Sequence, residues 1–213
     1  MNALRLAQVS LRINAHPLFA PLNLTVEPGE VTSVIGPSGS GKSSLLKFLC
    51  GILPGDIAGA GSVHIGDDDV TAWTPQSRRL GMLFQDPLLF PHLDVAGNVL
   101  FGLRNGGSRR ERQQRAADAL ASVGLDQFGP RDPATLSGGQ QARVALLRVL
   151  LAEPRALLLD EPFRSLDDAN RQRIRELVFA EAKKRGLPTL LVTHDPLDVA
   201  AAGGPVVELQ SQR

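Results

Sequence analysis

The segment Val31-Thr-Ser-Val-Ile-Gly36-Pro-Ser-Gly-Ser-Gly41-Lys42-Ser43 decides the fold of this chain. Its first five residues are mostly apolar, which predicts a buried strand over Val31–Ile35. The glycine-rich part that follows fits the pattern Gly-x4-Gly-Lys-Ser/Thr. Apolar residues then recur at helical spacing, at Leu45, Phe48, Leu49 and Ile52. We therefore expect a strand, a loop and a helix over residues 43–53 whose apolar face packs on a sheet.

This strand–loop–helix context gives the glycine-rich loop a chemical meaning. Glycines allow backbone N–H groups to converge on phosphate oxygens, and the start of a helix adds a favourable dipole. Lys42 should reach the β- and γ-phosphates of a nucleotide, and the Ser43 hydroxyl should ligate Mg²⁺. A serine-glycine turn that matches by chance is the alternative. The expected nucleotide contacts are Gly36, Pro37, Ser38, Gly39, Ser40, Gly41, Lys42, Ser43 and Ser44.

The rest of the chain alternates apolar runs with helical patterns, which indicates an α/β fold around a buried, mainly parallel sheet. The amino-terminal stretches 4–13 and 23–27 alternate in polarity and predict antiparallel edge strands. A short strand over 62–65 should follow a turn at Gly59-Ala-Gly61. Between Gln85 and Glu153 the helical pattern dominates. We expect a helical subdomain over 85–153, inserted into a nucleotide-binding core of residues 1–84 and 154–213.

Composition narrows the class of protein. The 213 residues carry 23 basic and 22 acidic side chains, so the balance of charge predicts no nucleic-acid partner. The single cysteine, Cys50, has apolar neighbours and is expected in the core. No apolar run is long enough to span a bilayer, and the first twenty residues do not resemble a signal peptide. We expect a cytoplasmic protein whose membrane role, if any, depends on a partner.

Two adjacent carboxylates follow the buried strand predicted over 156–159. Asp160 is placed to hold the Mg²⁺ shell, directly or through water, and Glu161 could orient or deprotonate an attacking water. A polar strand end without function is the alternative. Gln85 follows the strand predicted over 80–84, and His194 follows the one over 189–193. If these strands run parallel, Gln85 could reach the metal and His194 the γ-phosphate at one edge of the sheet.

A second glycine-rich helix start lies far from the first, at Leu136-Ser137-Gly138-Gly139-Gln140. Ser137 is a natural N-cap for a helix that runs to about Ala152. Two glycines in a first turn each destabilise a helix by roughly 1 kcal/mol, so a purely structural start would not need them. The close approach of a phosphate to this helix start would need them. Because the chain already has one phosphate loop, this spare site predicts a dimer.

Six ordered motifs make nearly the whole chain resemble the ATP-binding subunit of an ABC transporter. They are the Walker A loop (36–43), the Q-loop Gln85, the signature (136–140), Walker B through Glu161, the D-loop Ser165-Leu166-Asp167 and the switch His194. The resemblance implies a RecA-like P-loop NTPase core with an antiparallel β edge and an inserted α-helical subdomain. It also implies a homodimer that sandwiches two ATP-Mg²⁺ head to tail. Each signature and each D-loop Asp167 would then contact the partner's nucleotide.

Finer features resemble importer ATPases, and the stretches 132–140 and 143–148 look particularly like short YnjD-type subunits. The stretches 84–93 and 98–103 look like the region that receives a cytoplasmic helix of the permease, with a solute-binding protein as an indirect partner. An exposed patch at Leu88-Leu89-Phe90 would suit that contact, and core packing is an equal interpretation. The family stacks adenine on an aromatic residue where this chain has Ile13, with His16 as the nearest ring.

Three other classes share part of this pattern. An ATPase of an exporter or lipoprotein-extraction complex would carry the same motifs, but the segment after Gln85 favours an importer. A soluble ABC ATPase of DNA repair or translation usually needs a long coiled coil or a second ATPase domain. A small-molecule kinase would use the phosphate loop and has no use for the signature.

Overall fold

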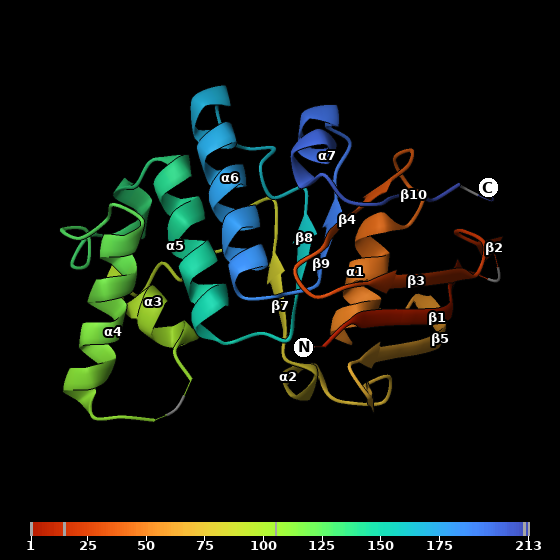
Figure 1. Cartoon of the computed structure of the whole chain (residues 1–213), viewed down its shortest axis with the longest axis horizontal. Coiled ribbons are helices and arrows are strands. Elements are labelled where there is room, and N and C mark those ends of the chain that lie inside the picture. The colour runs from red at the N-terminus through yellow and green to blue at the C-terminus, as the bar shows by residue number, and fades with distance from the viewer. Residues whose placement is uncertain (1, 15, 105, 211, 213) are drawn as a thin grey trace. The chain divides into compact units, whose positions relative to one another are not determined.

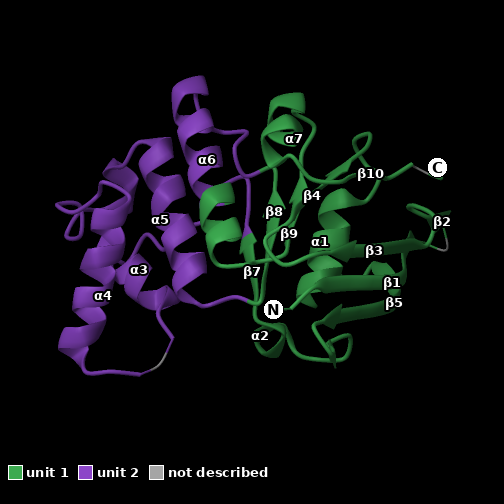
Figure 2. Cartoon of the chain, viewed as in Figure 1, with its two compact units in different colours: residues 1–82, 155–161, 179–213 green, residues 83–154, 162–178 purple. Residues whose placement is uncertain are grey.

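The computed structural model describes residues 2–14, 16–104, 106–210 and 212 and is shown in Figure 1. The chain divides into two compact units, drawn in Figure 2. The nucleotide-loop unit contains residues 1–82, 155–161 and 179–213, and the helical unit contains 83–154 and 162–178. The division expected from the sequence assigned residues 162–178 to the core, whereas their contacts group them with the helical unit.

A parallel sheet lies at the centre of the nucleotide-loop unit, in the order β10-β4-β9-β8-β7. Its buried middle strands are β4 (Val31–Ile35), β9 (Thr189–Val192) and β8 (Ala156–Asp160). The outer strands are β7 (Leu80–Leu83) and β10 (Val206–Glu208). Strand β9 pairs in parallel with both β4 and β8. The expected parallel sheet is confirmed, and the carboxyl ends of β4, β8 and β9 meet at one edge.

A second, antiparallel sheet forms from β1 (Leu4–Ile13), β2 (His16–Pro17), β3 (Leu22–Val26), β5 (Ile57–Ile65) and β6 (Asp68–Asp69). The antiparallel pairing expected for the stretches 4–13 and 23–27 is confirmed, but they form a sheet of their own in which β1 pairs with both β3 and β5 and is not an edge strand. The expected turn at Gly59–Gly61 is wrong, because these glycines lie inside β5. Gly61 has φ +99°, and a Cβ there would lie 2.5 Å from the Gln8 carbonyl oxygen. The glycine thus permits a bulge between the two strands.

The helical unit contains α3 (Val95–Gly102), α4 (Arg109–Ser122), a short 3₁₀ turn η1 (Pro133–Thr135) and α5 (Gly138–Leu151). It also holds the first part of α6 (Asp168–Lys184). Its core combines apolar faces from α3, α4 and α5. A capping box starts α4, because the Ser108 side chain accepts the Glu111 backbone N–H and the Glu111 side chain accepts the Ser108 backbone N–H. Among the described residues, no helix combines the length and apolar character that crossing a bilayer requires.

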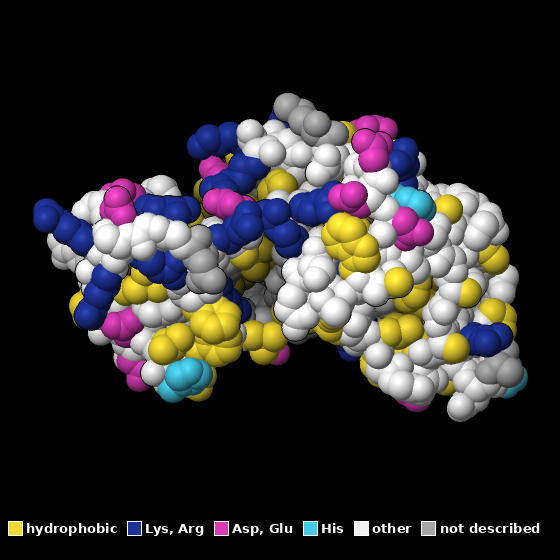
Figure 3. Space-filling model, turned by 90° about the horizontal axis from the view of Figure 1, so that it is seen from below, with side chains coloured by type: hydrophobic (Ala, Val, Ile, Leu, Met, Phe, Trp, Pro, Cys, Tyr) yellow, Lys and Arg dark blue, Asp and Glu magenta, His cyan; other side chains and the backbone are white. Residues whose placement is uncertain are grey.

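An aromatic patch lies on the surface of the helical unit, where Figure 3 shows hydrophobic side chains gathered beside a histidine. This Phe101 patch consists of Leu88, Phe90, His92 and Phe101. The Phe90 and Phe101 ring centroids are 4.6 Å apart, and Phe101 is 66% exposed. Leu88 is also exposed, whereas Leu89 packs against the core of the unit. The segment 88–90 is therefore partly an exposed patch and partly core, so each of these two interpretations describes part of it.

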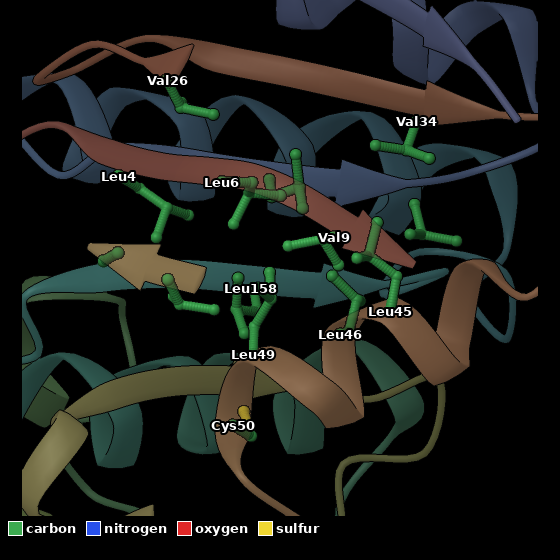
Figure 4. Close-up of a cluster of buried hydrophobic side chains, with 14 of the residues drawn as sticks. Leu4, Leu6, Val9, Val26, Val34, Leu45, Leu46, Leu49, Cys50 and Leu158 are labelled. Atoms are coloured by element: carbon green, nitrogen blue, oxygen red, sulfur yellow. The ribbon is translucent and has the colours of Figure 1, made fainter. Parts of the chain in front are cut away.

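Helix α1 (Lys42–Cys50) packs its apolar face into the core between the two sheets, which Figure 4 shows around Leu45, Leu46 and Leu49. Cys50 lies in this core, and burial raises the pKa of its thiol to about 11. The expectation that Ile52 lies on the apolar face of this helix is wrong. The helix ends at Cys50 because Gly51 adopts the left-handed conformation, and Ile52 beyond it is 47% exposed.

A buried guanidinium holds the carboxyl end of α1. Arg78, at the end of α2 (Pro75–Arg78), donates to the carbonyls of Phe48 and Leu49 at 2.9 and 2.7 Å. It also donates to the carbonyls of Thr71 and Trp73. These bonds satisfy carbonyls at the end of the helix and place a positive charge at the negative end of its dipole. Arg78 therefore fixes the helix that starts at the phosphate loop.

Replacing Arg78 by methionine should lower the free energy of unfolding by about 2–4 kcal/mol, because the four carbonyls lose a buried charged donor. Urea unfolding measures the change. Arg12→Met, at an exposed position of β1, serves as the control and should change stability by less than about 0.5 kcal/mol. Equal effects of the two substitutions would contradict the assigned role of Arg78.

Candidate functional site

The glycine-rich loop between β4 and α1 curves around the Lys42 ammonium. Gly39 and Gly41 have φ +82° and +94°, in the region that favours glycine. A Cβ on Gly36 would lie 2.5 Å from the carbonyl oxygen of Leu209, so only glycine fits there. This ammonium donates to the carbonyls of Gly36 and Pro37 at 2.7 and 2.8 Å. Ser40 is fully buried beneath the loop, while Pro37, Ser38 and Gly39 are exposed.

A pocket of about 330 Å³ opens over this loop. Its lining combines the polar groups of the loop and Glu161 with the apolar side chains of Ile13 and Leu18. Ile13 thus lines the same pocket as the loop, whereas the alternative His16 is exposed on β2. Sequence reasoning missed Leu18, which carries no motif. A Cβ on Gly41 would lie 3.1 Å from Leu18 Cδ1, so packing against the loop positions this residue. The pocket lining consists of Ile13, Leu18, Ser38, Gly39, Gly41, Lys42, Ser43, Ser44 and Glu161.

A hydroxyl and a carboxylate meet at the edge of the sheet. Ser43 Oγ, in the first turn of α1, donates to Asp160 Oδ1 at the end of β8 over 2.9 Å. Burial raises the pKa of Asp160, and the Ser43 hydrogen bond partly offsets that effect. Two oxygen ligands beside an open phosphate loop match the way Mg²⁺ is held, by one or two protein oxygens and the substrate phosphates. The residues present therefore fit this metal ion.

Glu161 and His194 form a pair next to this hydroxyl and carboxylate. The Glu161 Oε2 and His194 Nδ1 atoms are 3.2 Å apart, with the carboxylate mostly buried and the imidazole 59% exposed. Glu161 has φ +45°, an unfavourable backbone conformation for a residue with a side chain. Its N–H donates to the Val192 carbonyl at 2.9 Å, which holds the strained turn in place. The parallel strands thus bring Asp160, Glu161 and His194 together, as the sequence predicted.

Gln85 belongs to the helical unit and follows β7 by two residues. Its side chain is exposed, and its backbone carbonyl accepts a hydrogen bond from Ser165 Oγ at 3.0 Å. Within the helical unit, the start of the Q-loop is therefore bonded to the D-loop.

The segment 136–140 forms the predicted helix start. Ser137 caps α5, because its Oγ accepts from the Gln140 N–H while Gln140 Oε1 accepts from the Ser137 N–H. Leu136 is buried, and Ser137 and Gly138 are exposed at the tip. Packing within the chain also bears on Gly139. A Cβ there would lie 2.6 Å from Asn170 Oδ1, so the Asn170 side chain would have to move to admit a larger residue.

The D-loop leads into α6 and is held by the same asparagine. Asp167 Oδ1 accepts from the Asn170 N–H at 3.1 Å, and Oδ2 accepts from Asn170 Nδ2 at 2.7 Å. These hydrogen bonds lower the pKa of the exposed Asp167 carboxyl. Sequence reasoning missed Asn170. Its position three residues after Asp167 was the only signal available, since that spacing places a side chain beside the N-cap of a helix.

The sequence is similar to that of curated transporter proteins. It is 43% identical to the uncharacterized ABC transporter ATP-binding protein YnjD of Escherichia coli K12, over 91% of this chain and 89% of that one. It is 41% identical to the Fe(3+) ions import ATP-binding protein FbpC 1 of Rhizobium meliloti, and 44% identical to a putative 2-aminoethylphosphonate import ATP-binding protein, PhnT, of Salmonella choleraesuis. These two matches cover 93% and 87% of this chain but only 56% and 51% of the respective relatives.

The fold is similar to that of a solved ATP-binding cassette, MJ0796, in a dimeric post-hydrolysis state bound to ADP and Pi. The TM-score is 0.79 at 30% sequence identity, over 99% of this chain and 97% of that one. The ABC transporter family also matches this sequence directly, over residues 19–164. The chain therefore belongs to the ABC transporter family and is one of its ATPases.

Proposed function

We propose that this chain binds ATP-Mg²⁺ in the pocket over the Walker A loop and hydrolyses it as a head-to-tail homodimer that drives a membrane permease. The observation that carries the proposal is the arrangement of Ser43, Asp160, Glu161 and His194 beside that loop. Two oxygen atoms that could ligate Mg²⁺, a carboxylate on a strained backbone and an exposed imidazole lie at one sheet edge. They lie next to a pocket large enough for a nucleotide.

Binding would begin at the loop. Its N–H groups and the Lys42 ammonium would hold the β- and γ-phosphates, while Ile13 and Leu18 would contact the base through apolar surface. Ser43 and Asp160 would hold Mg²⁺, and Gln85 would complete its shell. The ion would neutralise charge on the phosphates. Because Ile13 and Leu18 are aliphatic, the base would be bound by apolar contact instead of aromatic stacking.

Hydrolysis would depend on the pair Glu161 and His194. The Glu161 carboxylate lines the pocket and would orient or deprotonate the attacking water. The His194 imidazole, in contact with that carboxylate, would donate a hydrogen bond to the γ-phosphate. Lys42 would stabilise the charge that develops on the transferred group. The strained backbone of Glu161 supports this role, because strain is retained where a side chain must be aimed.

The signature and the D-loop would serve the nucleotide of the partner chain. Ser137 and Gly138 are exposed at the first turn of α5, where helix N–H groups can meet a phosphate, and Gly139 and Gln140 support that turn. Leu136 anchors the loop in the core of the helical unit. Asp167 is exposed immediately before α6. The dimeric state of the similar cassette MJ0796 supports this arrangement.

The Phe101 patch is the surface that we assign to the permease. It exposes Phe101 and Leu88 on the helical unit, and the Arg148 guanidinium lies 5.0 Å from the Phe90 ring centroid. Arg148 also donates to the carbonyls of Leu88 and Pro87, which fixes the loop that carries the patch. An amphipathic helix from a permease would bury these side chains. The chain would then lie at the cytoplasmic face of the membrane.

The names of the FbpC and PhnT relatives favour an importer of a small solute. Such a system would deliver solute through a binding protein that contacts the permease and not this chain.

Replacing Glu161 by glutamine should abolish steady-state ATP hydrolysis and trap a dimer that holds ATP, because the amide cannot accept the proton of the attacking water. Phosphate release and size-exclusion chromatography with light scattering measure the two effects. Glu208→Gln, an exposed position on β10, is the matched control and should behave as wild type. Hydrolysis by the Glu161 variant at the wild-type rate would refute its role.

Replacing Phe101 by aspartate should reduce the amount of permease that co-purifies from membranes at least about tenfold, because a charge would enter the centre of an apolar contact. The ATP-dependent dimerisation of the Phe101→Asp variant should be unchanged. Leu197→Asp is the matched control, since Leu197 is equally exposed at 64% but lies in the nucleotide-loop unit. Co-purification of ribosomes or DNA in place of a polytopic protein would contradict the transport proposal.

A further inference from the structure

Asn170 contacts two functional segments of the helical unit at once. It lies half-buried in the first turn of α6, the helix that follows the D-loop. Its backbone and side-chain N–H groups donate to the two carboxylate oxygens of Asp167, at 3.1 and 2.7 Å. Both oxygens of that carboxylate are therefore occupied by one residue, which fixes the orientation of the exposed Asp167 side chain.

The other side of the Asn170 side chain lies against the signature. An ideal Cβ on Gly139 would be 2.6 Å from Asn170 Oδ1, 2.7 Å from Cγ and 3.1 Å from Cβ. The carboxamide thus occupies the space that a side chain at Gly139 would need. Gly138 is close to the D-loop as well, since its Cβ would contact Leu166 Cδ2 at 3.7 Å. The first turns of α5 and α6 are packed through these glycines.

We propose that Asn170 is a positioning residue that joins the D-loop carboxylate to the signature helix, so that both meet the opposite nucleotide as one rigid element. This inference rests on the proposed head-to-tail dimer. Asn170 itself would touch neither nucleotide. It would act by fixing Asp167 and by filling the space above Gly139, and these two contacts align the two segments that one chain offers to its partner.

The chemistry of the amide explains why asparagine suits this position. Its Nδ2 donates to Asp167 while its Oδ1 faces the glycine. Aspartate has the same shape but no donor, and it would place a second carboxylate at hydrogen-bonding distance from the first. Like charges at that separation repel each other, and the pair would be relieved only by taking up a proton. The Asn170→Asp substitution should therefore rotate or displace Asp167 without changing the volume packed on Gly139.

The test uses the full chain carrying Glu161→Gln, so that dimerisation is measured without turnover. Asn170→Asp should weaken the ATP-dependent dimer at least about tenfold at pH 8, with part of the loss recovered at pH 5.5 as the carboxylate pair takes up a proton. The affinity of the monomer for ATP should not change, because its pocket is lined by residues of the nucleotide-loop unit. Gln172→Glu is the matched control: the same change on the same helix, beside Glu176.

Three results separate the possible failures. If the parent chain with Glu161→Gln does not dimerise with ATP, the proposed function fails and not merely this inference. If the parent dimerises and Asn170→Asp dimerises as well as Gln172→Glu, the inference is overturned. Equal loss of ATP binding and dimerisation would also overturn it, because that pattern indicates a structural role. Should Asn170→Asp fail to fold, Asn170→Ala removes the same hydrogen bond without adding charge, and the same dimer measurement applies.

Discussion

The parallel pairing of β4, β9 and β8 is the constraint on which the site depends, and the hydrogen bond from Ser43 Oγ to Asp160 Oδ1 is its clearest result. This hydrogen bond joins two segments that lie 117 residues apart in the chain. The parallel register makes it possible, because β9 aligns Val192 with both Val34 of β4 and Asp160 of β8. The phosphate loop that follows β4 and the carboxylates that follow β8 must then share one edge. Burying the strands therefore also assembles the site.

The same constraint explains the location of strain and of buried charge. Asp160 is partly buried, which raises its pKa, and the hydrogen bond from Ser43 partly offsets that effect. Glu161 adopts an unfavourable backbone angle one residue later, and its N–H bond to Val192 keeps the turn in place. At the other end of α1, Arg78 fixes the carbonyls of the helix. The loop is thus supported from both sides.

Much of the fold and of the site could be predicted from the sequence, because the signals were local. Residues 31–35 are mostly apolar, residues 156–159 are a continuous apolar run, and the glycine pattern between β4 and α1 has few other uses. Contacts between distant segments could not be predicted. The end of α1 is held by Arg78, thirty residues after Phe48, and the bulge at Gly61 depends on the opposite strand. Gly139 packs against Asn170, thirty-one positions later, and no local pattern reveals such a partner.

The central claim is that each nucleotide site is completed by the signature of the other chain. It is tested most directly by mixing two inactive variants, Lys42→Ala and Ser137→Arg, and measuring ATP hydrolysis. In a head-to-tail heterodimer both lesions fall in one composite site and the other site is intact, so the account predicts that the mixture regains activity that neither variant has alone. If heterodimers form, as shown by mass measurement, and the mixture stays as inactive as its components, the account is contradicted.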